Sequence, residues 1–324
     1  MTVLVTGFAG GLAREVARAL RRAGREVVGV DYRPIPQLEG DLEGVETHRA
    51  QYHKTAIDDV FRRRRYEAVL HLGRVGNLSE RMQKRFDLNV MGTRRLFASA
   101  KSYGVRRLVV LSTFHVYGAS PANHTPISEE DPLRAGPDFP EIADAIQLDA
   151  MATQWAFQHP EVGLAVLRPT NVVGAAIDNT MSRLLRRERV PKLLGFNPMT
   201  QFIHARDLAE AIVAAMNGTE RGVFNVAGAT AIPWDTAIDI VGARRLPVPG
   251  SIAMAAVRAF STFPAYLVNF LKYPCVITDG AFRKAFGWRP ALDMRATLED
   301  VRRTRRVEEG SSASGSESAP QRTS

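Results

Sequence analysis

Short apolar runs rich in β-branched residues alternate along the chain with segments of helical periodicity. Between the first two runs, Leu12, Val16 and Leu20 recur at a spacing of four, which is typical of one face of a helix. Hydrophobicity inside the runs is continuous, so helices should cover both faces of the sheet. The pattern predicts the α/β class with a doubly wound parallel sheet. The predicted strands are residues 3–7, 27–31, 45–50, 68–73, 107–113, 164–170 and 222–228.

The pattern becomes looser after Pro169 and predicts a second, smaller α+β lobe at the C-terminal side. We expect a first domain over residues 1–170, a second lobe with interleaved segments over 171–308, and a disordered tail over 309–324. The tail is expected because it consists of small and polar residues with nothing to bury.

Two segments of the second lobe carry more specific predictions. After residue 204, Asp207 is expected to cap a helix, with Glu210 three residues later completing a capping box. Residues 251–271 are the most apolar stretch, but Arg258, Pro264 and Asn269 interrupt it. A buried helical pair or an apolar wall is therefore favoured over a membrane span.

Composition and charge narrow the class of protein. The 324 residues are 45% hydrophobic and 24% charged, which is typical of a globular chain. The formal net charge is +9, but acidic residues are interspersed and no basic stripe with aromatic residues is found, so nucleic-acid binding is not expected. Cys275 is the only cysteine and cannot form an internal disulfide. Residue 1 leads directly into a strand without a signal-peptide pattern, so a cytoplasmic location is expected.

The stretch "TGFAGGLA", residues 6–13, follows the first predicted strand and opens a helix. Gly7 suits a tight turn and Gly10 suits close approach of backbone to a pyrophosphate, which the free amides of a helix N-terminus attract. Asp31 ends the second strand, where a carboxylate would accept hydrogen bonds from an adenosine ribose. A carboxylate there would repel a 2′-phosphate, so the pattern predicts NAD; Arg33 keeps NADP open as an alternative.

Several motifs together make the chain resemble the extended short-chain dehydrogenases/reductases, in particular the NAD-dependent epimerase/dehydratase family typified by UDP-galactose 4-epimerase. The resemblance extends over nearly the whole chain up to the tail and implies a Rossmann fold. It is carried by "TGFAGGLA", "HLG" at 71–73, "NVMGT" at 89–93, "LSTFHVYG" at 111–118, "LRPTNVVG" at 167–174, "FIHARDLA" at 202–209, "GVFNVAG" at 222–228 and "FGWRP" at 286–290.

The resemblance implies a set of cofactor-binding residues. Gln51 stands nearest the place of an aspartate that receives the adenine amino group in the family, and its amide oxygen could accept the same bond. Asn89 should lie beneath the groove. The remaining implied residues are Gly7, Gly10, Gly11, Leu12 and Asp31 for the adenosine diphosphate half, Leu72 and Gly73 for the groove, and Thr170 and Asn171 near the nicotinamide and the substrate.

The family's catalytic residues are only partly matched. Thr113 matches the hydroxyl residue of the trio, whose other members are a tyrosine and a lysine four residues later. Counting back from Arg168 places the tyrosine at Ala143 and the lysine at Gln147. The chain contains no tyrosine between residues 117 and 266 and no lysine between residues 101 and 192, so the usual proton carrier is missing.

His115 is the residue that we expect to replace this carrier. It lies two positions after Thr113, and an imidazole there could titrate near neutral pH and pass a proton through Thr113. An ordinary packed histidine is the alternative. His71, His204 and Tyr117 are expected to be structural. Asp144 and Asp149, five apart on the helix, are expected to be surface residues.

The substrate is predicted less sharply. The nucleotide-sugar epimerases that the chain resembles bind the diphosphate with an arginine just before the "FIH" strand. Thr200 and Gln201 stand there in this chain, so a nucleotide diphosphate is disfavoured. Phe263, Tyr266, Leu267 and Phe270 would suit an apolar ligand. Two functions stay open: an enzyme that oxidises, reduces or epimerises a hydroxyl or carbonyl carbon, and an inactive NAD-binding sensor or scaffold. No metal is expected; a homodimer and peripheral membrane contact stay open.

Overall fold

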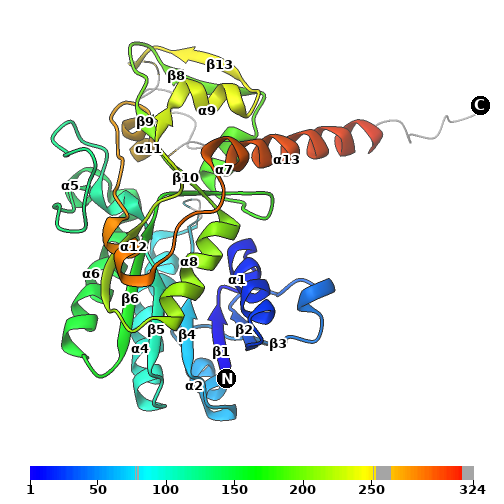
Figure 1. Cartoon of the computed structure of the whole chain (residues 1–324), viewed down its shortest axis with the longest axis vertical. Coiled ribbons are helices and arrows are strands. Elements are labelled where there is room, and N and C mark those ends of the chain that lie inside the picture. Colours follow the sequence, from blue (N-terminus) through cyan, green and yellow to red (C-terminus); the bar gives the residue numbers. More distant parts are fainter. Residues whose placement is uncertain (77, 79, 251, 253–263, 316–324) are drawn as a thin grey trace, which may run out of the picture.

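The computed structural model describes the chain except for residues 77, 79, 251, 253–263 and 316–324. Two lobes lie one above the other along the longest axis (Figure 1). The lower lobe contains the large sheet, and the upper lobe contains short two-stranded sheets and several helices. The α/β class and the smaller second lobe predicted from the sequence are confirmed.

The large sheet has seven strands, and all of its neighbouring strands are parallel. Its order is β11-β6-β5-β4-β1-β2-β3, so the chain builds outward from β1 in one direction and then from β4 in the other. This reversal between β1 and β4 opens a crevice at the carboxyl ends of the strands. The strands are β1 (Thr2–Thr6), β2 (Glu26–Asp31), β3 (Glu46–Arg49), β4 (Ala68–His71), β5 (Arg107–Leu111), β6 (Gly163–Pro169) and β11 (Gly222–Val226).

Helices cover both faces of the sheet, as the continuous hydrophobicity of the strands requires. Helices α1 (Gly11–Arg22) and α8 (Ala205–Asn217) pack on one face and share a core with Val3 and Val5. The other face, which includes Leu4, packs against the remaining large helices. These are α2 (Ala56–Arg63), α4 (Gly92–Ser102) and α6 (Ala143–Gln158).

The upper lobe is built on three small sheets around the fully buried Trp234. Strand β10 pairs with β7, β12 with β9, and β13 with β8. The strands are β7 (Asn171–Val173), β8 (Arg189–Leu193), β9 (Met199–Thr200), β10 (Phe202–His204), β12 (Ile232–Pro233) and β13 (Arg244–Val248). Besides α8 on the large sheet, the described α-helices that follow β7 are α7 (Thr180–Leu185), α9 (Trp234–Ile240), α11 (Ala265–Phe270), α12 (Gly280–Phe286) and α13 (Met294–Gly315).

Short helical segments connect the larger elements. They are η1 (Gly40–Leu42), α3 (Met82–Phe86), the π-helical turn η2 (Asp87–Met91), η3 (Phe114–Tyr117), α5 (Ala135–Asp138) and η4 (Pro140–Ile142). Two of them, η3 and η4, lie at the carboxyl end of β5 and before α6, where they shape the crevice wall.

Predictions about the second lobe and the tail need correction or fall outside the described residues. Asp207 does not cap α8: His204 is the cap, and the Asp207 carboxylate instead accepts the backbone N–H groups of Ala291 and Leu292. Helix α13 continues to Gly315, so residues 309–315 of the predicted disordered tail are helical, and residues 316–324 lie outside the described part.

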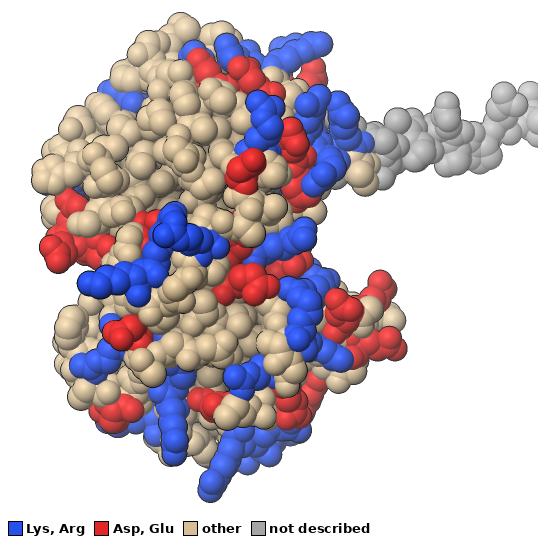
Figure 2. Space-filling model, in the orientation of Figure 1, with Lys and Arg blue, Asp and Glu red and all other residues tan. Residues whose placement is uncertain are grey.

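Most of the apolar stretch 251–271, including Phe263, also lies outside the described residues, and its last part forms α11. None of the helices that the structure describes is long and apolar enough to cross a membrane. Figure 2 shows basic and acidic side chains interspersed over the visible face, in agreement with the charge pattern of the sequence.

Candidate functional site

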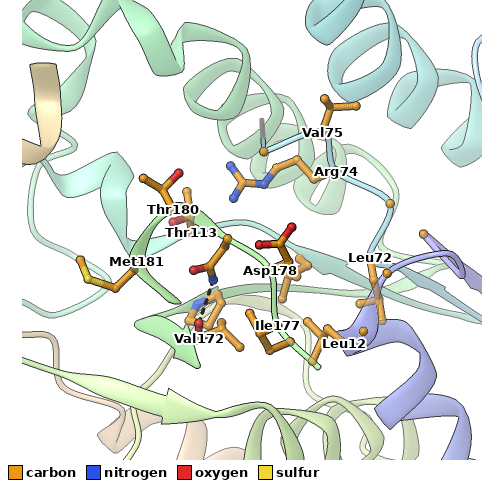
Figure 3. Close-up of a pocket in the computed structure, with 18 of the residues that line it drawn as sticks. Leu12, Leu72, Arg74, Val75, Thr113, Val172, Ile177, Asp178, Thr180 and Met181 are labelled. Carbon is orange, nitrogen blue, oxygen red and sulfur yellow. Dashed lines mark hydrogen bonds between the residues drawn. The ribbon is translucent and has the colours of Figure 1, made fainter. Parts of the chain in front are cut away.

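A cavity of about 530 Å³ opens at the carboxyl ends of β1, β2, β4, β5 and β6, next to the point where the strand order reverses. Residues that follow each of these strands line it, together with Ile142 before α6 and Tyr266 on α11. Figure 3 shows Leu12 and Leu72 at one end and Thr113, Thr180 and Met181 at the other. The cavity therefore joins the glycine turn of the large lobe to the upper lobe.

The glycine turn between β1 and α1 has the geometry that the sequence predicted. Gly7 has a positive φ of 77°, and a Cβ there would lie 2.7 Å from the Cα of Gly73. A Cβ on Gly11 would lie 1.8 Å from the carbonyl oxygen of Ala176, so the loop after β7 reaches across the turn. No side chain caps the N-terminus of α1, and its backbone N–H groups stay free for an anion.

Asp31 is fully buried at the end of β2 and lines the cavity. Its Oδ2 accepts the N–H of Ala9 at 2.9 Å, and its Oδ1 accepts the N–H of Arg33 at 2.8 Å. The half-exposed guanidinium of Arg33 lies 3.3 Å from the same carboxylate. These bonds, together with those from Nε and Nη2 of Arg33 at 3.3 Å, fix the carboxylate beside the glycine turn and give each of its oxygens two donors.

Gln51 is not brought to the cavity. It is exposed, and the next residue, Tyr52, forms part of the wall instead. The Tyr52 hydroxyl accepts the N–H of Gly7 at 3.0 Å and donates to the carbonyl of Val30 at 3.3 Å, and burial raises its pKa. Successive side chains of an extended segment point to opposite sides, so a one-residue difference in register exchanges the two positions.

The end of β4 forms the floor of the groove. The N–H groups of Leu72 and Gly73 both donate to the Thr6 hydroxyl at 3.1 Å, and both residues line the cavity. Asn89 does not line the cavity itself, but its side chain bonds both backbone groups of Val75, which does. His71 is structural: it is buried between the hydroxyls of Thr6 and Thr93, and burial lowers its pKa to about 4.

Thr113, His115, Thr170 and Asn171 meet at the opposite end of the cavity. Thr113 accepts the N–H of His115 at 3.3 Å, and the Thr170 hydroxyl is buried without a partner among the described residues. Asn171 donates its side-chain amide to the carbonyl of Gln201 at 3.2 Å. Two further predicted site residues, Gly10 and Leu12, lie at the glycine turn and also line the cavity.

His115 does not titrate near neutral pH, in contrast to the prediction. Its ring packs against Phe270 and Tyr266, with centroids 4.8 and 5.4 Å apart, and its Nε2 is buried without a partner in the described structure. Burial and the nearby Arg74 cation lower its pKa to about 3, although a bond with Asn171 acts in the other direction. The imidazole is therefore neutral over the physiological range.

The start of α6 presents an aliphatic face to the cavity. Ala143 and Gln147, the positions predicted for a tyrosine and a lysine, are both exposed and do not line it. Ile142 lines the cavity instead, and Ile146, four residues later, packs on the adjoining apolar cluster. A shift of one residue on a helix turns the side chain by about 100°, so the count from Arg168 selected the wrong face.

Asp144 and Asp149 are not surface residues. Both are buried, because two different sides of α6 pack against other parts of the chain. Asp144 forms an ion pair with Arg85 and also bonds Asn89. Asp149 accepts two bonds from Arg168, from Nε at 2.9 Å and from Nη2 at 2.6 Å. These pairs tie α6 to the rest of the cavity wall.

His204 and Tyr117 are structural, as predicted. His204 bonds Asp300 of α13 through Nε2 at 3.2 Å. The buried Tyr117 hydroxyl donates to Asn225 at 2.8 Å and accepts from Arg168 at 2.9 Å.

The sequence did not predict that the charged residues Arg74, Glu80, Arg85, Asp178 and Arg183 line the cavity, and Tyr266 was expected only as an apolar residue. Arg74 follows Gly73 directly, in "HLGRVG" at the carboxyl end of β4. The sequence feature that could have indicated Arg74 is a single cation among small and apolar residues at the end of a strand. Burial raises the pKa of Tyr266 to about 12, while Arg74 and Arg85 act in the opposite direction.

The strand order and the position of the cavity are those of the doubly wound α/β class, in which ligands bind where the strand order reverses. The NAD dependent epimerase/dehydratase family matches residues 3–227, and the chain belongs to this family. This confirms the resemblance predicted from the motifs.

Two relatives illustrate the range of the family. A UDP-glucose 4-epimerase of Streptomyces lividans is 29% identical over 328 residues, which cover 92% of this chain and 94% of that protein. An uncharacterized protein of Mycobacterium tuberculosis is 29% identical over 227 residues, and the match covers 68% of this chain but only 60% of the relative.

Solved structures share the fold at low sequence identity. A UDP-glucose 4-epimerase of Thermotoga maritima with UDP-glucose has a TM-score of 0.77 at 20% identity, covering 95% of this chain and 100% of that one. The Thermus thermophilus UDP-glucose 4-epimerase in complex with NAD has a TM-score of 0.76 at 20% identity, covering 94% and 99% of the two chains.

Proposed function

We propose that the protein catalyses an NAD-linked oxidation, reduction or epimerisation at a carbon that carries a hydroxyl or carbonyl group. The observation that carries this proposal is the single cavity that connects the glycine turn and Asp31 to Thr113, His115 and Asn171. Membership of an NAD-dependent family supports the same reaction class.

The residues at the end of the cavity next to the glycine turn fit NAD. The free amides of α1 would hold the pyrophosphate, the close contacts at Gly7 and Gly11 leave no room for larger residues, and Asp31 would accept ribose hydroxyls. Bound NAD would supply a nicotinamide carbon that accepts or returns a hydride. The Asp31 carboxylate favours NAD over NADP because it repels a 2′-phosphate.

The proton requires an atypical carrier, because the face of α6 toward the cavity is aliphatic. In this proposal Thr113 binds the reacting oxygen and His115, as a neutral imidazole, donates or accepts a hydrogen bond there. Tyr266 also lines the cavity, and its hydroxyl forms no hydrogen bond within the part of the chain that is described. As a protonated phenol near neutral pH, it can donate a proton to an alkoxide formed by carbonyl reduction.

Spectrophotometry of the nicotinamide tests this proposal. The protein with NADH or NAD is offered a panel of keto and hydroxy compounds, including nucleotide sugars, because relatives carry the name UDP-glucose 4-epimerase. Turnover should fall at least about tenfold in Thr113→Val and in Tyr266→Phe. Tyr273→Phe is the matched control, because Tyr273 does not line the cavity.

A catalytically inactive sensor or scaffold is the second candidate, and the aliphatic start of α6 favours it. Tight NADH binding without turnover of any compound would support this candidate and contradict the enzyme. Turnover that is unchanged in both cavity variants would contradict the assigned roles of Thr113 and Tyr266.

A further inference from the structure

The charged side chains that line the cavity are paired, with one exception. Asp31 bonds Arg33, Glu80 bonds Lys84 at 2.8 Å, and Asp178 bonds Arg183 at 3.1 Å. Arg85 pairs with Asp144. His115 is neutral near pH 7 because its pKa lies at about 3. The remaining charge in the described lining is the guanidinium of Arg74.

Arg74 forms no side-chain hydrogen bond or ion pair within the part of the chain that is described. Its guanidinium points into the cavity, toward the end that holds Thr113 and Thr180 (Figure 3). Asp144 attracts it from a distance, but the oxygens of Asp144 are already bonded to Arg85 and Asn89. Burial lowers the pKa of Arg74, while the attraction of Asp144 acts in the opposite direction.

The guanidinium of Arg74 points away from the place proposed for the dinucleotide pyrophosphate. Leu12, which belongs to the helix that would hold the pyrophosphate, lies at the opposite end of the cavity from Thr180, toward which the guanidinium points (Figure 3). An anion bound to Arg74 beside Thr113 would therefore belong to a second molecule.

The cavity walls around Arg74 indicate the chemical character of the rest of that molecule. Ile142, Tyr266 and Leu267 line the cavity and belong to one apolar cluster, and Tyr266 lies close enough to Arg74 to affect its pKa. A planar guanidinium binds a carboxylate through two parallel hydrogen bonds, and one unpaired cation balances one negative charge.

We propose that Arg74 binds a carboxylate of the substrate, so that the substrate class is a small hydroxy or keto acid with an apolar body. This inference rests on the proposed NAD-linked function. It assigns Arg74 to substrate specificity and leaves the oxygen at Thr113 as the reacting group.

The test uses the full chain loaded with NAD and isothermal titration calorimetry with three probes: 3-hydroxyoctanoate, its methyl ester and octyl phosphate. The wild type should bind the acid at least about tenfold tighter than the ester, which is the value of a charge-assisted hydrogen bond. Arg74→Gln should abolish this preference. Arg62→Gln should retain it, because that arginine on α2 does not line the cavity.

The outcomes separate the two proposals. Absence of NAD binding by the wild type would contradict the proposed function. NAD binding with no preference for the acid, no binding of either probe, or a preference that survives in Arg74→Gln would overturn the role of Arg74. Tighter binding of octyl phosphate than of the acid, lost in Arg74→Gln, would overturn the carboxylate and assign a phosphate group.

Discussion

Removing the Asp149 carboxylate tests the buried network that anchors α6 to the sheet. Asp149 is fully buried, and its oxygens accept two bonds from Arg168 and one from the Ser112 hydroxyl. Asp149→Ala removes all three bonds and leaves the guanidinium of Arg168 buried without its counter-ion. Breaking a buried pair in this way costs about 3–5 kcal/mol, a large part of the stability of a typical protein.

Urea denaturation followed by far-UV circular dichroism at pH 7 measures this cost. The matched control is Asp59→Ala, because Asp59 also pairs with an arginine, Arg62, at 2.7 Å but both side chains are more than 60% exposed. We expect the control to change the free energy of unfolding by less than about 0.5 kcal/mol. The double variant Asp149→Leu/Arg168→Met should recover much of the loss. A loss of less than about 1 kcal/mol in Asp149→Ala would refute the reasoning.

Three further predictions concern the cofactor end and the pH dependence. Gly7→Ala should weaken NADH binding at least about tenfold in a fluorescence titration, because the added Cβ would meet the Cα of Gly73. Gly24→Ala is the control, since Gly24 has a similar φ but open space around it, and NADH binding should stay unchanged. Equal effects of the two variants would contradict the close packing at Gly7. Asp31→Asn should reduce the preference for NAD over NADP, measured in the same way, and an unchanged ratio would show that the carboxylate does not set it. The pKa of His115 is about 3 in the folded protein and near 6.5 when unfolded, so the unfolded state binds the extra proton and stability should fall as the pH drops from 6.5 toward 3. In His115→Phe the urea midpoint should fall less between pH 7 and pH 4.5 than it does in the wild type. An equal fall in both proteins would contradict the burial of the neutral imidazole.

The sequence predicted the large sheet and the glycine turn well because both depend on local patterns. Most predicted strands are short continuous apolar runs, and burial on both faces follows directly from that pattern; the edge strand β3, with the sequence ETHR, is the exception. Gly7 and Asp31 were found because a tight turn and a strand-end carboxylate require those residue types at fixed places.

The catalytic end was predicted less well because it depends on register and on contacts between distant segments. The helix face of α6 was misplaced by one residue, which exchanged Ala143 for Ile142 at the cavity wall. The burial of Asp144 depends on Arg85, 59 positions away in the sequence, and no local pattern indicates this contact. The pKa of His115 depends in the same way on burial and on Arg74.

The most direct test of the account is calorimetric titration of NAD and NADP into the wild type and into Asp31→Asn. The account predicts that NAD binds with measurable heat and tighter than NADP in the wild type, and that the variant loses most of this difference. Absence of heat with both dinucleotides would contradict the central claim that the cavity beside the glycine turn is a cofactor site.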